Sequence, residues 1–276
     1  MGSEMCIRDS AYTSFFRVTS LFKDPSLYGR YLVVPIAVLL VVVLVRKGRT
    51  VDWVVSAALV AFLFWGLFYS YSQSSFVALF VVTFAVAVYG VSRRLRILLL
   101  VCAAIVAVGA AAYAAQAIEG RSAREATSGR SRLVTVTLDA FAERPVAGVG
   151  VGGQPRASTD VSHRGSPGRN ASHTTPLTIL AEGGVVGFSL YLWVLGAAGW
   201  VLYLVTSRDG PLGVALAAVL VALFVHSLLY AGFFEDPLAW GVLGVAAAFL
   251  AAAPIPREAE EDAQRPATSA PHVLAH

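Results

Sequence analysis

Long runs of apolar residues alternate with short polar breaks along most of the chain. About 20 apolar residues are enough to cross the hydrocarbon core of a bilayer as a helix. Backbone groups in lipid must be hydrogen-bonded within their own segment, and the alternation of a barrel strand is absent. The pattern therefore predicts an all-α, polytopic transmembrane bundle with about seven spans. They fall at residues 31–45, 51–69, 75–91, 95–115, 185–206, 212–230 and 238–253.

One long polar stretch, residues 117–175, interrupts this series with eight arginines and no lysine. Long loops without secondary structure of their own are uncommon and usually functional. The apolar spacing of residues 131–141 predicts a short amphipathic helix that lies on the membrane and is stopped by Pro145. The glycines of residues 148–153 favour a flexible turn over a backbone anion nest. Residues 154–170 are rich in Ser, Gly, Pro and Arg, and we expect them to be mobile.

The loop closes on the start of a new helix. Thr175 and Pro176 predict an N-cap and a first-turn proline, and the helix should run to Glu182 and break at Gly183-Gly184 before the next span. The chain then divides into a leader (1–10), a four-span membrane domain (11–116), the arginine-rich loop (117–175), a three-span membrane domain (176–253) and a disordered tail (254–276). The leader has no apolar region of a signal peptide and resembles a translated adapter. We therefore expect an N-terminally truncated chain with further spans upstream.

Composition supports a membrane protein. The chain is 57% hydrophobic and 14% charged, with a mean hydropathy of +0.69, whereas soluble domains carry about 25% charged residues. Its two cysteines, Cys6 and Cys102, exclude a disulfide framework and a cysteine-based metal site. No pair of nearby carboxylates of the DxD type lies in the loop, so we expect no metal and no cofactor, and we expect no nucleic-acid partner.

The basic residues of the short loops predict the orientation. They gather in alternate loops, at Arg46 to Arg49, Arg93 to Arg96 and Arg208, while residues 70–74 and 231–237 carry none. The positive-inside rule places the basic loops and the C-terminus in the cytoplasm and residues 117–175 outside, because long loops cross largely regardless of charge.

Polar residues at three places are candidates for a functional role. His173 stands beside the positive end of a helix, and a neutral imidazole can take a proton near neutral pH; a solvated loop histidine is the alternative. His226, near the outer end of a span, is about as readily a packing residue, through Ser227, as a functional one. For Glu235 and Asp236, a solvated turn before Pro237 is favoured over an acceptor-binding pair.

The order of several motifs resembles the O-antigen ligase and O-antigen polymerase family. Arg130 is followed by a "PxxGxG" at residues 145–150, by His173, and by an "LxxLxExGxxG" at residues 177–187. Upstream, FKDPSLYG at residues 22–29 and SYSQSS at residues 70–75 are similar to two further family motifs. The resemblance covers residues 17–253. Gln73 stands where an arginine is common, and Thr174 where an asparagine is usual.

The resemblance implies a metal-independent, integral-membrane glycosyltransferase of lipopolysaccharide or other polysaccharide biosynthesis, at the outer face of the bacterial cytoplasmic membrane. Its donor would be a glycan linked to undecaprenyl diphosphate. The acceptor would be a hydroxyl of a lipid A core sugar, of a second lipid-linked repeat unit or of a protein. The lipid bilayer and other membrane proteins of polysaccharide assembly are the implied partners.

The same resemblance assigns roles to six residues. His173 would be catalytic. Arg130, Arg132 and Arg30 would hold the diphosphate, because arginine is always charged and binds phosphate in a bidentate manner. Ser72 and Gln73 would bind sugar hydroxyls; the alternative for the serines of residues 72–75 is that they only solvate a tight turn.

Two other function classes remain. A transporter or lipid-linked-oligosaccharide flippase would normally carry repeated halves with helices broken at mid-membrane, and no internal repeat is present. A non-catalytic anchor would not need an arginine loop that closes on a histidine.

Overall fold

The computed structural model describes residues 20–22, 24–46, 50–119, 130–163, 170–230 and 232–252. The leader, Lys47, Arg49 and the tail lie outside this part of the chain. Within the described ranges, every regular element is a helix. They are a 3-10 helix (Ser20–Phe22), α2 (Pro25–Leu44), α3 (Thr50–Ser70), α4 (Gln73–Gly90), α5 (Arg93–Glu119), α7 (Arg130–Glu143), α8 (Gln154–Ser162), α10 (Thr175–Arg208), α11 (Gly210–Leu229) and α12 (Pro237–Ala251).

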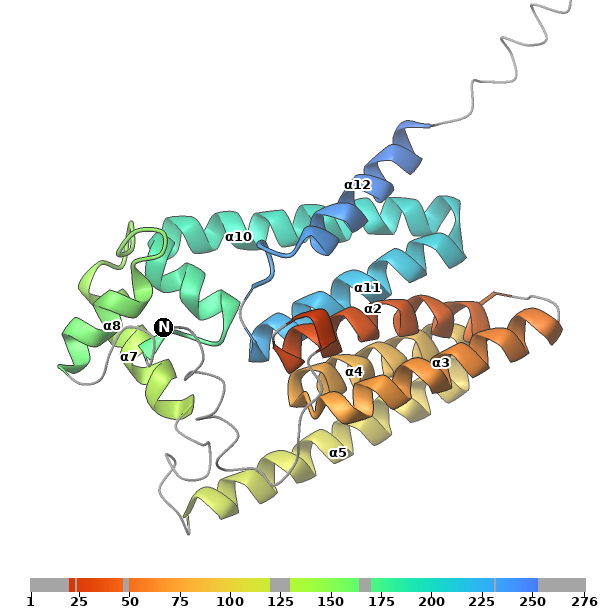
Figure 1. The fold of residues 1–276 in the computed structure, drawn as a ribbon, viewed down its shortest axis with the longest axis horizontal. Coiled ribbons are helices and arrows are strands. Elements are labelled where there is room, and N and C mark those ends of the chain that lie inside the picture. The colour runs from red at the N-terminus through yellow and green to blue at the C-terminus, as the bar shows by residue number, and fades with distance from the viewer. Residues whose placement is uncertain are drawn as a thin grey trace, which may run out of the picture.

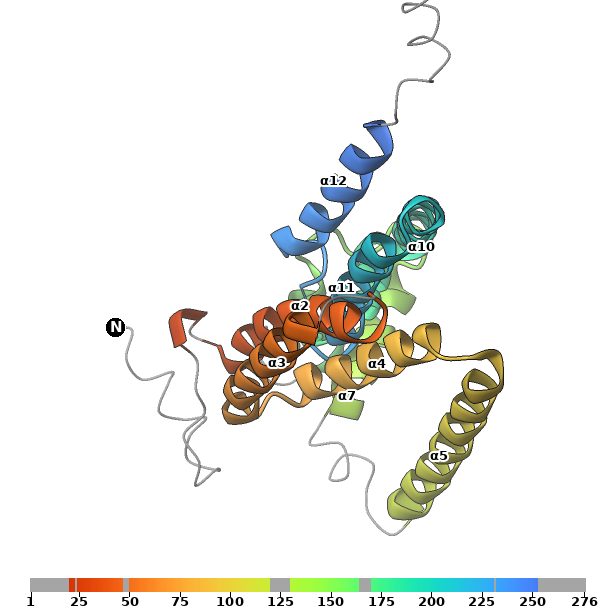
Figure 2. The ribbon, with the colours of Figure 1, turned by 90° about the vertical axis from the view of Figure 1, so that its right-hand side faces the viewer.

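Helices form at each position where a span is expected, and five of them are long and apolar enough to cross a membrane: α2, α3, α4, α10 and α11. The all-helical prediction is confirmed for the described residues. α12 has 15 residues, which is about 22 Å of helix and shorter than the hydrocarbon core. α5 has 27 residues and lies to one side of the bundle (Figure 2). The total of about seven spans therefore stays a prediction.

The five helices run side by side, and α11 is the most buried of them (Figure 1). It contacts α2, α4, α10 and α12, and the core includes Leu223 of α11, Val33 of α2 and Val82 of α4. At one end of the bundle α2, α4, α10 and α12 begin and α11 ends, and α7 and α8 lie beside the start of α10. We call this the loop end. The described arginines of the three basic loops lie toward the opposite end.

The start of α2 gives the motif at residues 22–29 a physical basis. Asp24 is the N-cap, and its Oδ1 accepts hydrogen bonds from the backbone N–H groups of Ser26 (2.6 Å) and Leu27 (3.2 Å). Pro25 follows at the first helical position, where its missing N–H costs nothing. A Cβ on Gly29 would overlap Ser75 of α4, so this glycine lets α2 and α4 approach closely.

α10 breaks where the sequence predicts. Gly184 has φ 61° and ψ −162°, a backbone conformation that only glycine adopts readily. The break divides the helix into a short segment before Gly184 and the long membrane segment after it. The expected N-cap is wrong by one residue: Thr174 is the N-cap and Thr175 begins the helix.

The turn after α7 hydrogen-bonds to this break. The N–H groups of Val149 and Gly150 donate to the carbonyls of Ala181 (2.9 Å) and Glu182 (3.0 Å). In return, the N–H group of Val185 donates to the carbonyl of Pro145 (2.8 Å). A broken helix leaves backbone groups without partners, which is costly in or near lipid. The turn supplies those partners, so residues 145–150 form a docked turn, and the N–H groups of Gly148, Val149 and Gly150 are not free for an anion nest.

Two glycines allow this close docking. A Cβ on Gly148 would overlap the Glu182 carbonyl, and a Cβ on Gly184 would overlap the Val146 carbonyl. Both residues also have positive φ. The two family motifs, far apart in sequence, are therefore the two halves of one backbone contact.

The prediction that residues 154–170 are mobile is wrong for residues 154–162, which form α8. Pro155 lies in its first turn, and the buried side chains of Gln154 and Ser158 face α7. α7 itself forms as predicted, but its Val136 and Ala140 are buried within the protein, while Val134 and Leu138 remain exposed. Residues 154–162 are therefore ordered because the side chains of Gln154 and Ser158 hydrogen-bond to α7. The composition of the segment does not reveal these bonds.

We expect Gly184→Ala to destabilise the protein by several kcal/mol, because strained φ costs about 1–3 kcal/mol and the added methyl overlaps a carbonyl. Gly183→Ala is the matched control, since a Cβ there meets nothing within 4 Å and its φ is not positive. The measurement is the thermal unfolding midpoint of both variants in nanodiscs. Equal midpoints would refute the role of this contact.

Candidate functional site

A buried ion pair joins the first and last described helices of the bundle at the loop end. The Nη1 atom of Arg30 in α2 lies 2.9 Å from Oδ2 of Asp236, and both side chains are nearly inaccessible. Asp236 is also the N-cap of α12, through a hydrogen bond from Leu238 N (3.0 Å). The expectation of a solvated turn at Asp236 is wrong, because the buried guanidinium requires a counter-charge.

His226 extends this pair into α4. Arg30 Nε donates to His226 Nδ1 (3.1 Å), and His226 Nε2 lies 3.0 Å from Ser74 Oγ. An Arg N–H can only donate, so Nδ1 must be the acceptor, and the imidazole is the neutral tautomer with its proton on Nε2. His226 thus connects α2, α11 and α4 through a single ring, which gives it a packing role.

The end of α11 closes the network. Tyr230 donates its hydroxyl to Asp24 Oδ2 (2.8 Å), and the guanidinium of Arg30 lies 5.9 Å from the Tyr230 ring centroid. The Tyr230 hydroxyl is the donor in this contact, because an ionised carboxylate oxygen can only accept.

The serine motif at residues 70–75 joins the end of α3 to the start of α4. Ser72 is buried and is the N-cap, and its hydroxyl lies 2.8 Å from Ser75 Oγ and 3.1 Å from Ser74 Oγ. Gln73, the first residue of α4, is exposed. Of the two residues expected to bind sugar, one is therefore inside the bundle and the other faces outward.

A second buried polar cluster holds the loop. The Gln154 amide nitrogen, which carries two hydrogens, lies within hydrogen-bonding distance of three acceptors: Thr137 Oγ1 (3.0 Å), Ser158 Oγ (2.8 Å) and the Asn170 carbonyl (3.1 Å). Its Oε1 accepts from Ser172 N (3.0 Å). Gln154 therefore connects α7 and α8 to residues 170–174, the segment that leads into α10.

His173 lies on a backbone that is held on both sides. Ser172 is bound to Gln154, and Thr174 Oγ1 donates to the carbonyl of Leu228 at the end of α11 (3.2 Å). The His173 side chain between them is exposed. The His173 imidazole is accessible, and the residues on both sides of it are held by hydrogen bonds. A group that transfers a proton has to be both accessible and positioned in this way.

Gly232 links this segment to the buried ion pair. Its N–H donates to Thr175 Oγ1 (3.2 Å), and its carbonyl accepts from Arg30 Nη1 (2.7 Å). The sequence-predicted residues Arg30, Ser72 and His173 are therefore brought to one end of the bundle. Arg130 and Arg132 lie in the first turn of α7, which packs against α8 and α10. Arg132 is half-buried.

Several polar residues of this site were not predicted. Asp24 was named only as part of the motif at residues 22–29, with no role of its own. Gln154 and Asn170 were placed in a stretch expected to be mobile. Asp236 carried a weak signal, an acidic residue directly before a helix-starting proline. Among the described residues, no group of three or more His, Cys, Asp or Glu side chains is placed to hold a metal.

These features define a polytopic helical membrane protein whose folded loop presents an exposed histidine above a buried polar network. The family model described as O-antigen ligase matches residues 57–192, about half of the chain. The chain belongs to the O-antigen ligase family, which confirms the resemblance noted from its motifs and indicates a membrane glycosyltransferase-like function. The match runs from α3 through the break in α10 and includes His173. No curated protein matches the chain.

We expect Asp236→Asn to lower stability by about 3–5 kcal/mol, the usual effect of leaving a buried charge without its partner. The adjacent Glu235→Gln is the control, because Glu235 is exposed and surface changes usually stay within about 0.5 kcal/mol. Both free energies of unfolding would be measured by denaturant titration of the detergent-solubilised protein. A similar value for the two variants would contradict a structural role for the ion pair.

Proposed function

We propose that this protein transfers or polymerises glycan from an undecaprenyl-diphosphate-linked donor onto an acceptor hydroxyl, without a metal, at the outer face of the cytoplasmic membrane. The observation that carries this proposal is the exposed His173 imidazole on a backbone fixed through Ser172 and Thr174. The family match supports the reaction class.

In this reaction the acceptor oxygen forms a bond to the anomeric carbon, and the bond from that carbon to the diphosphate oxygen breaks. His173 takes the proton of the acceptor hydroxyl as the new bond forms. The products are the glycosylated acceptor, undecaprenyl diphosphate and the proton on the imidazole. A neutral histidine is suited to this role near neutral pH.

The diphosphate gains negative charge as it leaves, and in this proposal arginines stabilise it. Arg130 and Arg132 in the first turn of α7 take this role by charge and bidentate hydrogen bonding. Arg30 is buried against Asp236, so it contributes by holding Gly232 and the His173 segment in place. Gln73 offers an exposed amide to a sugar hydroxyl, and Ser72 supports it as the N-cap of α4.

The orientation can be tested in a variant without Cys6 and Cys102. We expect Val151→Cys, at a position 97% exposed directly after the docked turn, to react with a membrane-impermeant maleimide in intact cells. Ser92→Cys, exposed between α4 and α5, should react only after permeabilisation. The reverse pattern would overturn the orientation, because the basic loops would then face outward.

We expect His173→Asn to insert normally and to reduce transfer by a factor of about 10² or more, the scale of losing a positioned general base. Transfer would be measured in proteoliposomes from an undecaprenyl-diphosphate-linked donor, with a chelator present.

His163→Asn is the matched control, because His163 is an exposed histidine of the same loop and asparagine tolerates its positive φ of 48°. It should transfer like the wild type. Wild-type transfer by His173→Asn would remove this residue as the base. Loss of wild-type activity on adding chelator would reject the metal-free mechanism. Lipid-linked glycan that crosses the bilayer without being transferred would favour a flippase.

A further inference from the structure

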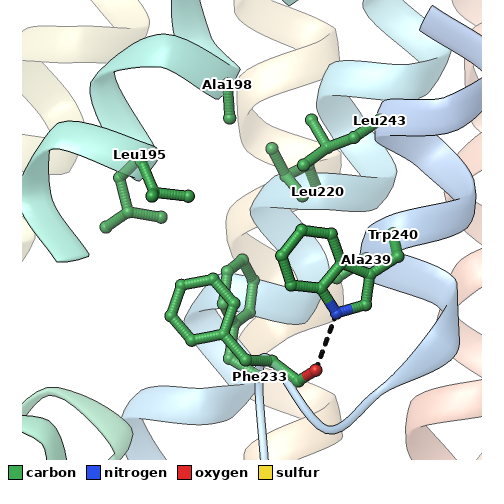
Figure 3. Close-up of a pocket in the computed structure, with 9 residues that line it drawn as sticks. Leu195, Ala198, Leu220, Phe233, Ala239, Trp240 and Leu243 are labelled. Carbon is green, nitrogen blue, oxygen red and sulfur yellow. Dashed lines mark hydrogen bonds between the residues drawn. The ribbon is translucent and has the colours of Figure 1, made fainter. Parts of the chain in front are cut away.

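The pocket between α10, α11 and α12 is a packed apolar seam. Leu195, Leu220 and Trp240 point toward one another in it (Figure 3). Its free volume is about 10 Å³, no more than a single water needs. The indole N–H of Trp240 is donated to the Phe234 carbonyl (2.8 Å). This seam holds helices together, whereas the buried cluster around Gln154 in the loop consists of polar groups.

Gln154 is the buried centre of that cluster. Its side chain is 1% exposed, although glutamine is mostly found at protein surfaces. Burying an amide is costly unless its N–H and C=O groups are hydrogen-bonded. An apolar side chain of similar size would pack between α7 and α8 without this cost. What the amide adds is therefore the set of hydrogen bonds that it makes.

Two of these bonds hold the backbone just before His173. Gln154 Nε2 lies 3.1 Å from the Asn170 carbonyl, and Gln154 Oε1 accepts from Ser172 N (3.0 Å). One amide group thus bonds a carbonyl and an N–H of the same segment, two residues apart. The segment cannot slide along α8 or turn away from it without losing one of the two bonds.

Ser172 extends this constraint past His173. Its hydroxyl accepts from Thr174 N (3.2 Å) and lies 3.3 Å from the Thr174 carbonyl. A serine hydroxyl that bonds to the backbone two residues on forms a compact turn. His173 is the central residue of this turn. The position of its Cα atom, and the direction in which its side chain leaves the backbone, therefore follow Ser172.

The start of α8 is itself held in place. The backbone N–H of Gln154 donates to Glu182 Oε1 (3.3 Å), directly before the break in α10. The N–H of Gly153 donates to the carbonyl of Gly150 at the end of the docked turn (2.9 Å). The position of the Gln154 amide is thereby set by the contact between the docked turn and α10.

We propose that Gln154 is a positioning residue of the transfer reaction, whose amide fixes the backbone that carries His173; this rests on the function proposed above. Gln154 is buried, so it acts through the His173 segment and not by contact with a substrate. A displacement of about 1 Å at a reacting group can lower a rate by about 10²-fold. Loss of the amide bonds therefore lowers kcat and leaves the binding of donor and acceptor unchanged.

The test uses the whole protein, with kinetics in proteoliposomes and amide hydrogen exchange in nanodiscs. Gln154→Met keeps the approximate size of the side chain and removes both bonds to the segment. We expect kcat to fall by about 10- to 100-fold with an unchanged KM for the lipid-linked donor, the pattern of an interaction that matters only in the transition state. Amide exchange of residues 171–174 should become faster.

Thr137→Val is the matched control, because Thr137 is as buried as Gln154 and belongs to the same cluster. The two hydrogens of Gln154 Nε2 still find two acceptors without Thr137, namely Ser158 Oγ and the Asn170 carbonyl. The bonds to the His173 segment are therefore kept. Thr137→Val should transfer glycan and exchange amide hydrogens at residues 171–174 like the wild type, whatever its unfolding midpoint.

Gln154→Asn serves where Gln154→Met does not fold. Asparagine keeps a polar group at the buried position, but its shorter side chain cannot bond Asn170 and Ser172 together. It should show the same fall in kcat and the same faster exchange. Where neither variant folds, the wild-type protein decides: slow exchange of the Ser172 amide supports the proposal, and rapid exchange overturns it.

Wild-type kcat in a folded Gln154 variant would overturn the proposal. An equal fall in kcat for Thr137→Val would do the same, because the effect would then come from lost stability. A raised KM with an unchanged kcat would assign the amide to substrate binding and would also overturn it. Hydrogen exchange is read without glycan transfer, so the two proposals fail separately. Exchange that depends on Gln154 in a protein that never transfers glycan would reject only the glycosyltransferase. Normal transfer and exchange in the Gln154 variants would reject only the role of Gln154.

Discussion

The structure depends on one constraint: a positive charge inside a membrane bundle must be fully paired. Arg30 meets it with Asp236, His226 and the carbonyl of Gly232. These partners come from α11, the start of α12 and the segment between them, and His226 passes the connection on to Ser74 of α4. Apolar contacts between membrane helices have no hydrophobic driving force against lipid, so polar contacts and close packing of small residues carry more of the specificity. The guanidinium thereby sets the arrangement of the loop end.

The loop is attached to this framework at two places. The broken helix α10 exposes backbone groups that the turn at residues 145–150 pairs with, and Gly148 and Gly184 allow the two backbones to meet. Gln154 fixes the segment before α10 from the other side. A stretch rich in polar residues is thus ordered without an apolar core of its own, because its backbone and amide groups find partners in α7, α8 and α10.

The segment that carries His173 lies between the network around Arg30 and the docked loop. Thr174 is bound to the end of α11, and Thr175 to Gly232, whose carbonyl is bound to Arg30. A buried residue in α2 is therefore connected to the segment that carries His173 through Gly232 and Thr175.

Much of this could be predicted from the sequence. Apolar run length predicts helices because lipid permits little else, and the break at Gly183-Gly184 is predicted because two glycines interrupt a helical pattern. The order of the motifs predicts the family because the glycines of residues 145–150 and of the break at Gly184 are the ones that the contact between these two backbone segments requires. The partners of Arg30, the fold of residues 154–162 and the link between His173 and α11 were decided only by the tertiary structure. Each joins residues far apart in sequence, and a hydrogen bond between two polar side chains leaves no periodic trace in either segment.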